Sequence, residues 1–274
     1  MSFICGELNY MSELIAVKNL TKIFSKGIFG KTYITAVDKV SFSIPSEKPI
    51  IFTLAGESGS GKSTTARLIL GLIKPTSGSI LYRGKDIWSM NRKEWKEYRR
   101  RVQAIFQDPY ATFNPLYKVD HALLTPLREF QLAERFKISE EDLINESLER
   151  VGLNPKEVLG KYPHQLSGGQ RQRIMMARAI MLRPEIIIAD EPVSMIDASL
   201  RAGILHLMFK LKEDFKTSFL YITHDLSTAY YISDVIALMY MGSIVEMGAA
   251  DKVIELSLIH ISEPTRPLYI SYAV

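Results

Sequence analysis

One segment restricts the fold more than any other: an apolar run over residues 50–55 that leads directly into a glycine-rich loop. A continuous apolar run of this length is typical of a parallel strand that is buried on both faces. A helical pattern over residues 62–72 follows the loop, and Pro75 and Gly78 are expected to close that helix. The order of strand, loop and helix predicts an α/β fold with a phosphate-binding unit.

The loop has the spacing Gly, four residues, Gly, Lys, Ser, which suits a bound anion. Glycines allow the backbone N–H groups to approach an anion closely, and the start of a helix adds partial positive charge. We expect Lys62 to reach the terminal phosphates of a nucleotide, Ser63 to hold Mg²⁺, and Thr64 to lie near the first phosphate. A flexible loop without a ligand is the alternative, and the flanking strand and helix disfavour it. The predicted binding residues are Gly56, Glu57, Ser58, Gly59, Ser60, Gly61, Lys62, Ser63 and Thr64.

The remaining pattern predicts one large α/β unit with an inserted helical lobe. Residues 14–24 and 33–44 resemble an antiparallel pair of strands, and residues 119–182 are mostly helical in pattern. Further strands are predicted at residues 186–190, 218–223 and 235–240, and their alternation with helices indicates a parallel sheet. The nucleotide-binding core is therefore expected at residues 14–106 and 186–256, and the lobe at residues 107–185.

Composition excludes several classes of protein. Hydrophobic residues make up 47% and charged residues 23%, which excludes an intrinsically disordered chain. The net charge of +4 is too small to imply a nucleic-acid partner. The single cysteine, Cys5, excludes an intramolecular disulfide and a cysteine metal cluster. The apolar runs are too short to span a bilayer as helices, so any membrane contact is expected to go through a partner.

Two adjacent carboxylates, Asp190 and Glu191, end the predicted strand at residues 186–190. Ligands of parallel α/β sheets bind at the carboxyl ends of the strands. Neighbouring residues at such an end point in different directions, so Asp190 can orient Mg²⁺ while Glu191 polarises an attacking water. A solvated strand terminus without a function is the alternative.

A second glycine motif precedes the last predicted helix of the lobe. Leu166 is followed by Ser167, Gly168, Gly169 and Gln170, so backbone N–H groups are exposed at a helix start. One nucleotide needs only one such group of exposed backbone N–H donors. Two of them in one chain are explained if two copies face each other and each motif completes the site of the other.

These motifs together resemble those of the ABC-type ATPases, over residues 14–256. The resemblance implies the ABC ATPase fold, with ATP and Mg²⁺ held between two ATPase subunits. It also implies a role for Gln107, which would join the core to the lobe and contact the metal and the water. Asp197 would lie in the loop that crosses the dimer interface. His224 would contact the γ-phosphate, whereas a lone histidine after a strand is otherwise more often structural.

The family stacks an aromatic ring on adenine, and two residues compete for that role. Phe24 follows the expected lead of residues 20–22, and Tyr33 lies nearer the usual distance before the phosphate loop. The insertion at residues 25–32 leaves the choice open, and either ring could instead belong to the core.

Residues 106–115 and 161–165 resemble the dipeptide/oligopeptide importer branch of the family. This implies a peripheral protein at the cytoplasmic face of the membrane, with permease subunits, an identical or homologous second ATPase, and indirectly an extracytoplasmic solute-binding protein. Members of the branch carry peptides, nickel or oligosaccharides. The alternative is a soluble ABC ATPase that acts on nucleic acid or ribosomes, but the chain has no long coiled coil, zinc cysteines or second cassette. A phosphate-loop kinase or GTPase is disfavoured by the second glycine motif.

Two other segments are predicted to lie at the surface. Residues 91–101 are rich in Lys and Arg, and we interpret them as the solvated face of an amphipathic helix rather than a nucleic-acid surface. Phe113, Pro115, Leu116 and Tyr117 are apolar in a segment expected at the surface, and we interpret them as a groove for a helix of the permease.

The two ends of the sequence fit the pattern less well. Residues 1–13 are interpreted as a leader, with Met11 as an alternative start. Residues 257–274 depart from the pattern of the branch and resemble translated adapter sequence, so the natural C-terminus is expected to differ.

Overall fold

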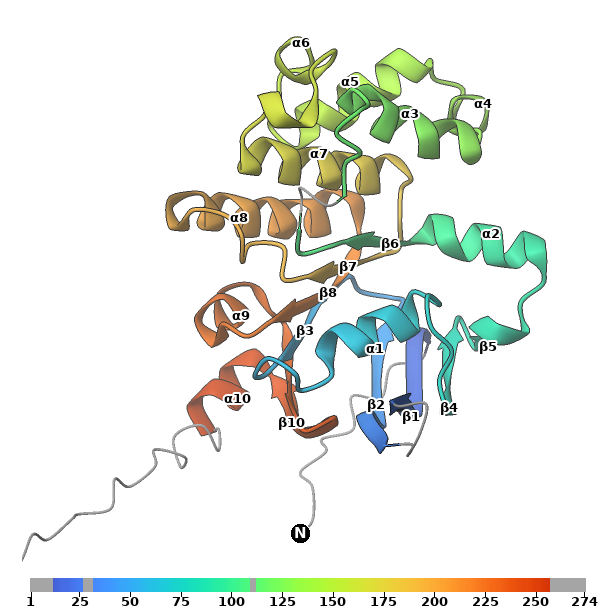
Figure 1. Ribbon diagram of the computed structural model, residues 1–274, viewed down its shortest axis with the longest axis vertical. Coiled ribbons are helices and arrows are strands. Elements are labelled where there is room, and N and C mark those ends of the chain that lie inside the picture. The colour runs from blue at the N-terminus through green and yellow to red at the C-terminus, as the bar shows by residue number, and fades with distance from the viewer. Residues whose placement is uncertain (1–11, 27–31, 109–111, 257–274) are drawn as a thin grey trace, which may run out of the picture.

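The computed structural model describes residues 12–26, 32–108 and 112–256 (Figure 1). The tail at 257–274, and the leader as far as residue 11, lie outside the described residues. The first sheet is antiparallel and has the strand order β2-β1-β4-β5. Its strands are β1 (Glu13–Lys26), β2 (Thr32–Pro45), β4 (Ser77–Tyr82) and β5 (Lys85–Asp86).

The second sheet has six strands in the order β10-β9-β3-β8-β7-β6, and all neighbouring pairs are parallel except β9 and β10. The strands are β3 (Ile51–Ala55), β6 (Val102–Ile105), β7 (Ile186–Asp190), β8 (Ser218–Thr223), β9 (Val235–Tyr240) and β10 (Ser243–Ala249). The predicted fold class is confirmed: a mostly parallel core, an antiparallel sheet and an inserted group of helices.

The central strands are apolar on both faces because each face is covered by a separate hydrophobic core. In β7, Ile187 packs in a core with the helical lobe, whereas Ile186 and Ile188 pack against the antiparallel sheet. Side chains alternate along β8 in the same way, with Phe219 on the lobe side and Leu220 on the other. An uninterrupted apolar run is therefore what this position in the fold requires.

The helices of the core are α1 (Lys62–Ile69), α2 (Arg92–Arg101), α8 (Ala198–Phe215), α9 (Leu226–Ile232) and α10 (Ala250–Leu256), with the 3-10 turn η1 (Ile87–Ser89). Residue 72 was the predicted end of the first helix, but α1 ends at Ile69. The chain turns at Gly71, which has a φ of 67° and lies against the ring of Trp95. The helix ends at this glycine rather than at Pro75 or Gly78, because Gly71 N donates to the Leu68 carbonyl oxygen and Leu72 N to the Arg67 carbonyl oxygen, the hydrogen bonds of a glycine C-cap.

Between β6 and β7 the chain forms the helical lobe, at the top of Figure 1. Its helices are α3 (Val119–Glu129), α4 (Leu132–Phe136), α5 (Glu140–Arg150), α6 (Pro155–Val158) and α7 (Gly168–Met181), with the 3-10 turn η2 (Pro163–Gln165). Helix α7 is buried on most of its surface because it lies between the lobe and the sheet. No helix among the described residues is long and apolar enough to cross a membrane.

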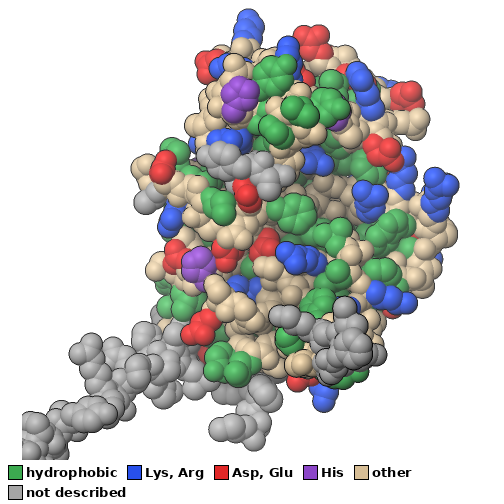
Figure 2. Space-filling model, in the orientation of Figure 1, with side chains coloured by type: hydrophobic (Ala, Val, Ile, Leu, Met, Phe, Trp, Pro, Cys, Tyr) green, Lys and Arg blue, Asp and Glu red, His purple; other side chains and the backbone are tan. Residues whose placement is uncertain are grey.

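The interpretation of residues 91–101 as a solvated helix face was only partly correct. Four basic side chains of α2 are exposed: Arg92, Lys93, Lys96 and Arg99. Blue side chains are spread over the right side of Figure 2, which has the orientation in which Figure 1 shows α2 on that side. Arg100, however, is 1% exposed and donates to the Leu182 carbonyl oxygen and to Glu97. The hydrogen bond from Arg100 is the first cause of the low pKa of Glu97, about 2. A buried cation needs such partners, and a local charge pattern does not show that they exist.

The prediction for Phe113 was wrong. This ring is 5% exposed and packs in the core of the helical lobe, so it cannot line a surface groove. Leu116 and Tyr117 are 81% and 51% exposed, and Pro115 is also exposed. The residues of the predicted groove therefore divide into one core residue and three surface residues.

Candidate functional site

The glycine-rich loop lies between β3 and α1 and packs against two neighbouring strands. A Cβ atom on Gly56 would lie 2.2 Å from the Met239 carbonyl oxygen, and one on Gly61 would lie 2.2 Å from the Ala36 carbonyl oxygen. Both glycines also have positive φ angles, 149° and 102°. No other residue fits these positions, because β2 and β9 leave no space for a side chain.

Lys62 is the first residue of α1 and is 5% exposed. Its Nζ donates to the carbonyl oxygens of Gly56 and Glu57, both at 2.7 Å. Burial lowers the pKa of Lys62, and the charges of Glu191 and Asp190 oppose that shift. The loop thus holds an ammonium group in its interior, where a phosphate group would replace the carbonyl oxygens as its partner.

Asp190 and Ser63 meet at the edge of the parallel sheet. The Ser63 hydroxyl donates to the Asp190 carboxylate at 3.1 Å. Burial raises the pKa of Asp190, and the hydrogen bond from Ser63 acts in the opposite direction. The hydroxyl and the carboxylate together provide two oxygen atoms beside the phosphate loop that can coordinate a metal ion.

Glu191 is held between two residues that are distant in sequence. One carboxylate oxygen accepts from Gln107 Nε2 at 3.0 Å, and the other contacts His224 Nδ1 at 3.0 Å. These residues follow β6, β7 and β8, which are neighbours in the sheet, so their side chains meet at its carboxyl edge. Glu191 has a φ of 46°, which non-glycine residues rarely adopt and which often marks a functional site.

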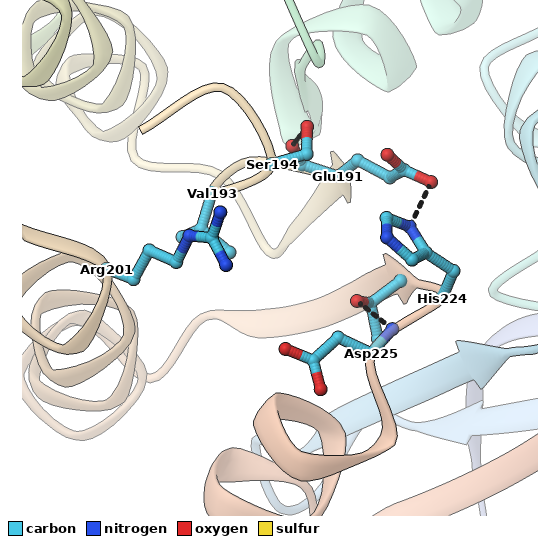
Figure 3. A pocket seen from close by; sticks show the side chains of 7 residues that line it. Glu191, Val193, Ser194, Arg201, His224 and Asp225 are labelled. Atoms are coloured by element: carbon cyan, nitrogen blue, oxygen red, sulfur yellow. Dashed lines mark hydrogen bonds and ion pairs between the residues drawn. The ribbon is translucent and has the colours of Figure 1, made fainter. Parts of the chain in front are cut away.

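A pocket of about 70 Å³ adjoins this cluster, and its lining includes Glu191 and His224 (Figure 3). Arg201 and Asp225 also line it, and neither was predicted from the sequence. Asp225 accepts from Ser227 N and so caps α9, and an aspartate directly before a helix is a recognisable N-cap signal in the sequence. Arg201 donates from Nε to the Ile196 carbonyl oxygen at 3.0 Å, a contact with no local sequence signal.

The second glycine motif forms the start of α7. Ser167 is the N-cap and exchanges hydrogen bonds with Gln170: its Oγ accepts from Gln170 N, and its N–H donates to Gln170 Oε1. Gly168 and Gly169 are the first helical residues. A Cβ on Gly169 would lie 3.3 Å from Leu200 Cδ1, so this helix start lies beside the segment that begins with Asp197.

In the part of the chain that the structure describes, the two glycine motifs are not joined by hydrogen bonds. Over residues 12–26, 32–108 and 112–256, no hydrogen bond joins residues 167–170 to the phosphate loop. Ser167 and Asp197 are exposed, and so are the apolar side chains of Met195 and Leu200 near them. This surface is accessible to a partner subunit.

Both candidate adenine-stacking residues are exposed, Phe24 at 40% and Tyr33 at 66%, so neither belongs to the core. Phe24 pairs with Ile34 and Ser25 pairs with Tyr33 on consecutive rungs of β1 and β2. Side chains on consecutive rungs point to opposite faces of a sheet. Only one of the two rings can therefore face a nucleotide.

Comparison with known proteins identifies the family. The ABC transporter family model matches residues 37–194, which span the phosphate loop, Gln107, the second glycine motif and both carboxylates. The chain belongs to the ABC transporter family. It is an ATPase whose ATP hydrolysis is coupled to transport, as the motif order predicted.

Curated relatives of this ABC ATPase cover most of its length. It is 38% identical to the di/tripeptide transport ATP-binding protein DppF of Pseudomonas aeruginosa over 89% of this chain and 75% of that one. It is 42% identical to the oligopeptide transport ATP-binding protein OppF of Bacillus subtilis over 89% of this chain and 78% of that one. A solved dimer of the ATP-binding cassette MJ0796, bound to ADP and phosphate, superposes with a TM-score of 0.72 at 26% identity, covering 86% and 98% of the two chains.

Proposed function

We propose that this ABC ATPase energises an importer of dipeptides or oligopeptides. Its relatives DppF and OppF are named as transport ATP-binding proteins for such solutes. In this proposal it works at the cytoplasmic face of the membrane with permease subunits, a second ATPase and an extracytoplasmic solute-binding protein. A soluble ABC ATPase that acts on nucleic acid or ribosomes is the alternative, and these relatives do not favour it.

The contact of Glu191 with Gln107 and His224 carries the proposed chemistry. Lys62 binds the β- and γ-phosphates, and Glu191 accepts a proton from the water that attacks the γ-phosphate. His224 contacts the γ-phosphate, and Gln107 orients the water. Ser167 and the N–H groups of α7 complete the site of the partner subunit; among the described residues, no hydrogen bond joins them to the phosphate loop of their own chain.

The residues also fit Mg²⁺. Ser63 and Asp190 provide the hard oxygen donors that Mg²⁺ prefers, and Gln107 is the third proposed contact. Among the described residues there is no cluster of three His, Cys, Asp or Glu side chains that would form a closed metal site. Magnesium in nucleotide sites is held by one or two side chains together with phosphate oxygens and water, and there it neutralises charge on the phosphates.

Reconstitution tests the proposed function as a whole. We expect ATPase activity of the complete transporter in proteoliposomes to rise when solute-binding protein and a di- or oligopeptide are added together. Nickel and an oligosaccharide serve as the competing cargos. Stimulation by one of them and not by peptides would overturn the peptide assignment, and activity without any permease dependence would overturn the transport assignment for this chain.

Leu116 and Tyr117 are proposed to contact the permease. Because both are exposed, the double change Leu116→Ser, Tyr117→Ser removes apolar contact area without opening a cavity. We expect peptide-dependent uptake to fall about tenfold or more while basal ATPase activity stays within about twofold. Leu72→Ser is the matched control. Leu72 is also an exposed apolar residue, at 60%, but it follows α1 in the core and does not belong to the lobe. Equal uptake in the two variants would contradict the proposal.

Replacing each candidate ring by alanine tests which of the two stacks on adenine. Because the rings lie on opposite faces, we expect only one of Phe24→Ala and Tyr33→Ala to raise the Kd for ATP, by about tenfold. Binding of inorganic tripolyphosphate, which has no base, should be unchanged in both variants. A similar loss of ATP affinity in both variants would contradict the placement of the two rings on opposite faces of the β1–β2 pair.

A further inference from the structure

The hairpin that joins β9 to β10 lies against the phosphate loop. Tyr240 pairs with Ser243, so the turn consists of Met241 and Gly242, with φ angles of 46° and 88°. Two-residue hairpin turns with positive φ at both positions favour Asn-Gly, and Met at the first position is unusual. The turn therefore has a backbone geometry that is maintained despite an unfavourable residue.

Gly242 forms hydrogen bonds in two directions. Its N–H donates to the Ser60 carbonyl oxygen at 3.0 Å, and its carbonyl oxygen accepts from Asp38 N at 2.8 Å. Ser60 is in the phosphate loop and is 5% exposed, so this bond is shielded from water. One residue thus connects the phosphate loop to β2.

The bond to Ser60 sets the orientation of the next peptide unit. In a trans peptide the C=O of one residue and the N–H of the next point in opposite directions. Because the Ser60 carbonyl is directed at the turn, the Gly61 N–H is directed away from it. No hydrogen bond within the described part of the chain uses the Gly61 N–H, which leaves this donor for a ligand.

We propose that Gly242 is a positioning residue for nucleotide binding: its N–H holds the Ser60 carbonyl so that the Gly61 N–H donates to a phosphate oxygen. This inference rests on the proposed role of residues 56–64 as the phosphate-binding loop. It assigns a part of the site to a turn far along the chain, outside the nucleotide motifs.

Gly242→Ala tests the inference. A Cβ there would lie 3.3 Å from the Ala36 carbonyl oxygen, so the turn and β2 must move apart by a few tenths of an ångström, and we expect the bond to Ser60 to weaken. The control is Gly84→Ala, in the Arg83–Gly84 turn between β4 and β5. That turn has φ angles of 48° and 79°, and nothing lies within 4 Å of the added Cβ. The two variants carry the same backbone strain, so the loss of thermal stability in Gly84→Ala measures that strain without the contact to Ala36.

Only Gly242→Ala is expected to weaken nucleotide binding. The Kd of the full chain for ATP and for inorganic tripolyphosphate should rise by about tenfold each, because the misplaced donor serves the phosphates. In the assembled transporter KM for ATP should rise while kcat stays within about twofold, because the bond acts in the ground state and the transition state alike. Gly242→Asn should show the same rise in Kd with less loss of stability, because asparagine adopts positive φ more readily than alanine.

Three results would overturn the inference: equal Kd values for the Gly242→Ala and Gly84→Ala variants, a rise for ATP without one for tripolyphosphate, or a fall in kcat alone. Lys62→Met separates the inference from the proposed site. If Lys62→Met loses ATP binding and Gly242→Ala does not, only the role of Gly242 is wrong. If Lys62→Met binds ATP normally, the assignment of the phosphate loop itself is wrong.

Discussion

Glu191→Gln is expected to lower kcat for ATP by about two to four orders of magnitude, the usual contribution of a general base. An amide has the size of the carboxylate and can still accept from Gln107, but it cannot take a proton from water. ATP affinity should stay within about threefold, because Glu191 is not proposed to bind the phosphates. The variant should therefore accumulate as an ATP-bound dimer, which size-exclusion chromatography with ATP measures.

The control for this prediction lies at the other end of the same strand. Glu185 immediately precedes β7 and accepts from Tyr82 and Arg83 at 2.6 Å and 2.9 Å. Burial works against the charged form of Glu185, yet these hydrogen bonds leave its pKa below the usual value. Glu185→Gln should lower the free energy of unfolding and leave kcat unchanged. Normal turnover in Glu191→Gln, or an equal loss in both variants, would remove Glu191 from its proposed role.

Lys62→Met should lower ATP affinity by about two to four orders of magnitude, since it removes charge-assisted contacts to two phosphates. Methionine retains the apolar stem, so the loop is not left with a large cavity. Isothermal titration with ATP measures the loss directly. Activity should fall with binding, because no later step can compensate for an empty site.

A second buried lysine provides the control for Lys62. Lys212 is also 5% exposed, and its Nζ lies 3.2 Å from Asp234, which in turn accepts from Ile51 N. Lys212→Met leaves that carboxylate without its cation and should destabilise the fold. Folded Lys212→Met protein should bind ATP normally. A similar loss of affinity in the two variants would mean that the effect of Lys62→Met arises from general destabilisation.

Much of the fold follows from local patterns. The predicted strands at residues 186–190, 218–223 and 235–240 coincide with β7, β8 and β9. Such agreement is possible because a parallel strand buried on both faces needs an uninterrupted apolar run, which few other elements require. The end of α1 was predicted three residues too late, at residue 72 instead of Ile69, although Gly71, the glycine at which the helix ends, is present in the sequence.

Local patterns did not predict which apolar or basic side chains are buried and which are exposed. Phe113 and Leu116 have the same apolar character and lie three residues apart, yet one is 5% exposed and the other 81%. Arg100 likewise looks like its basic neighbours but is buried against the end of α7. In each case the decisive term is a packing partner from a distant segment, which a local pattern does not contain.

The family, the glycine-rich loop, the paired carboxylates and the second glycine motif could all be recognised in the sequence. These rest on residue types at short fixed spacings, and the chemistry of a phosphate or a metal ion dictates those spacings. Only the tertiary structure brought Gln107 and His224 onto Glu191, across 84 and 33 residues of chain, and Gly242 onto Ser60. The physical reason is that strand order in the sheet decides which strand ends are neighbours, and that order arises from packing of the whole chain.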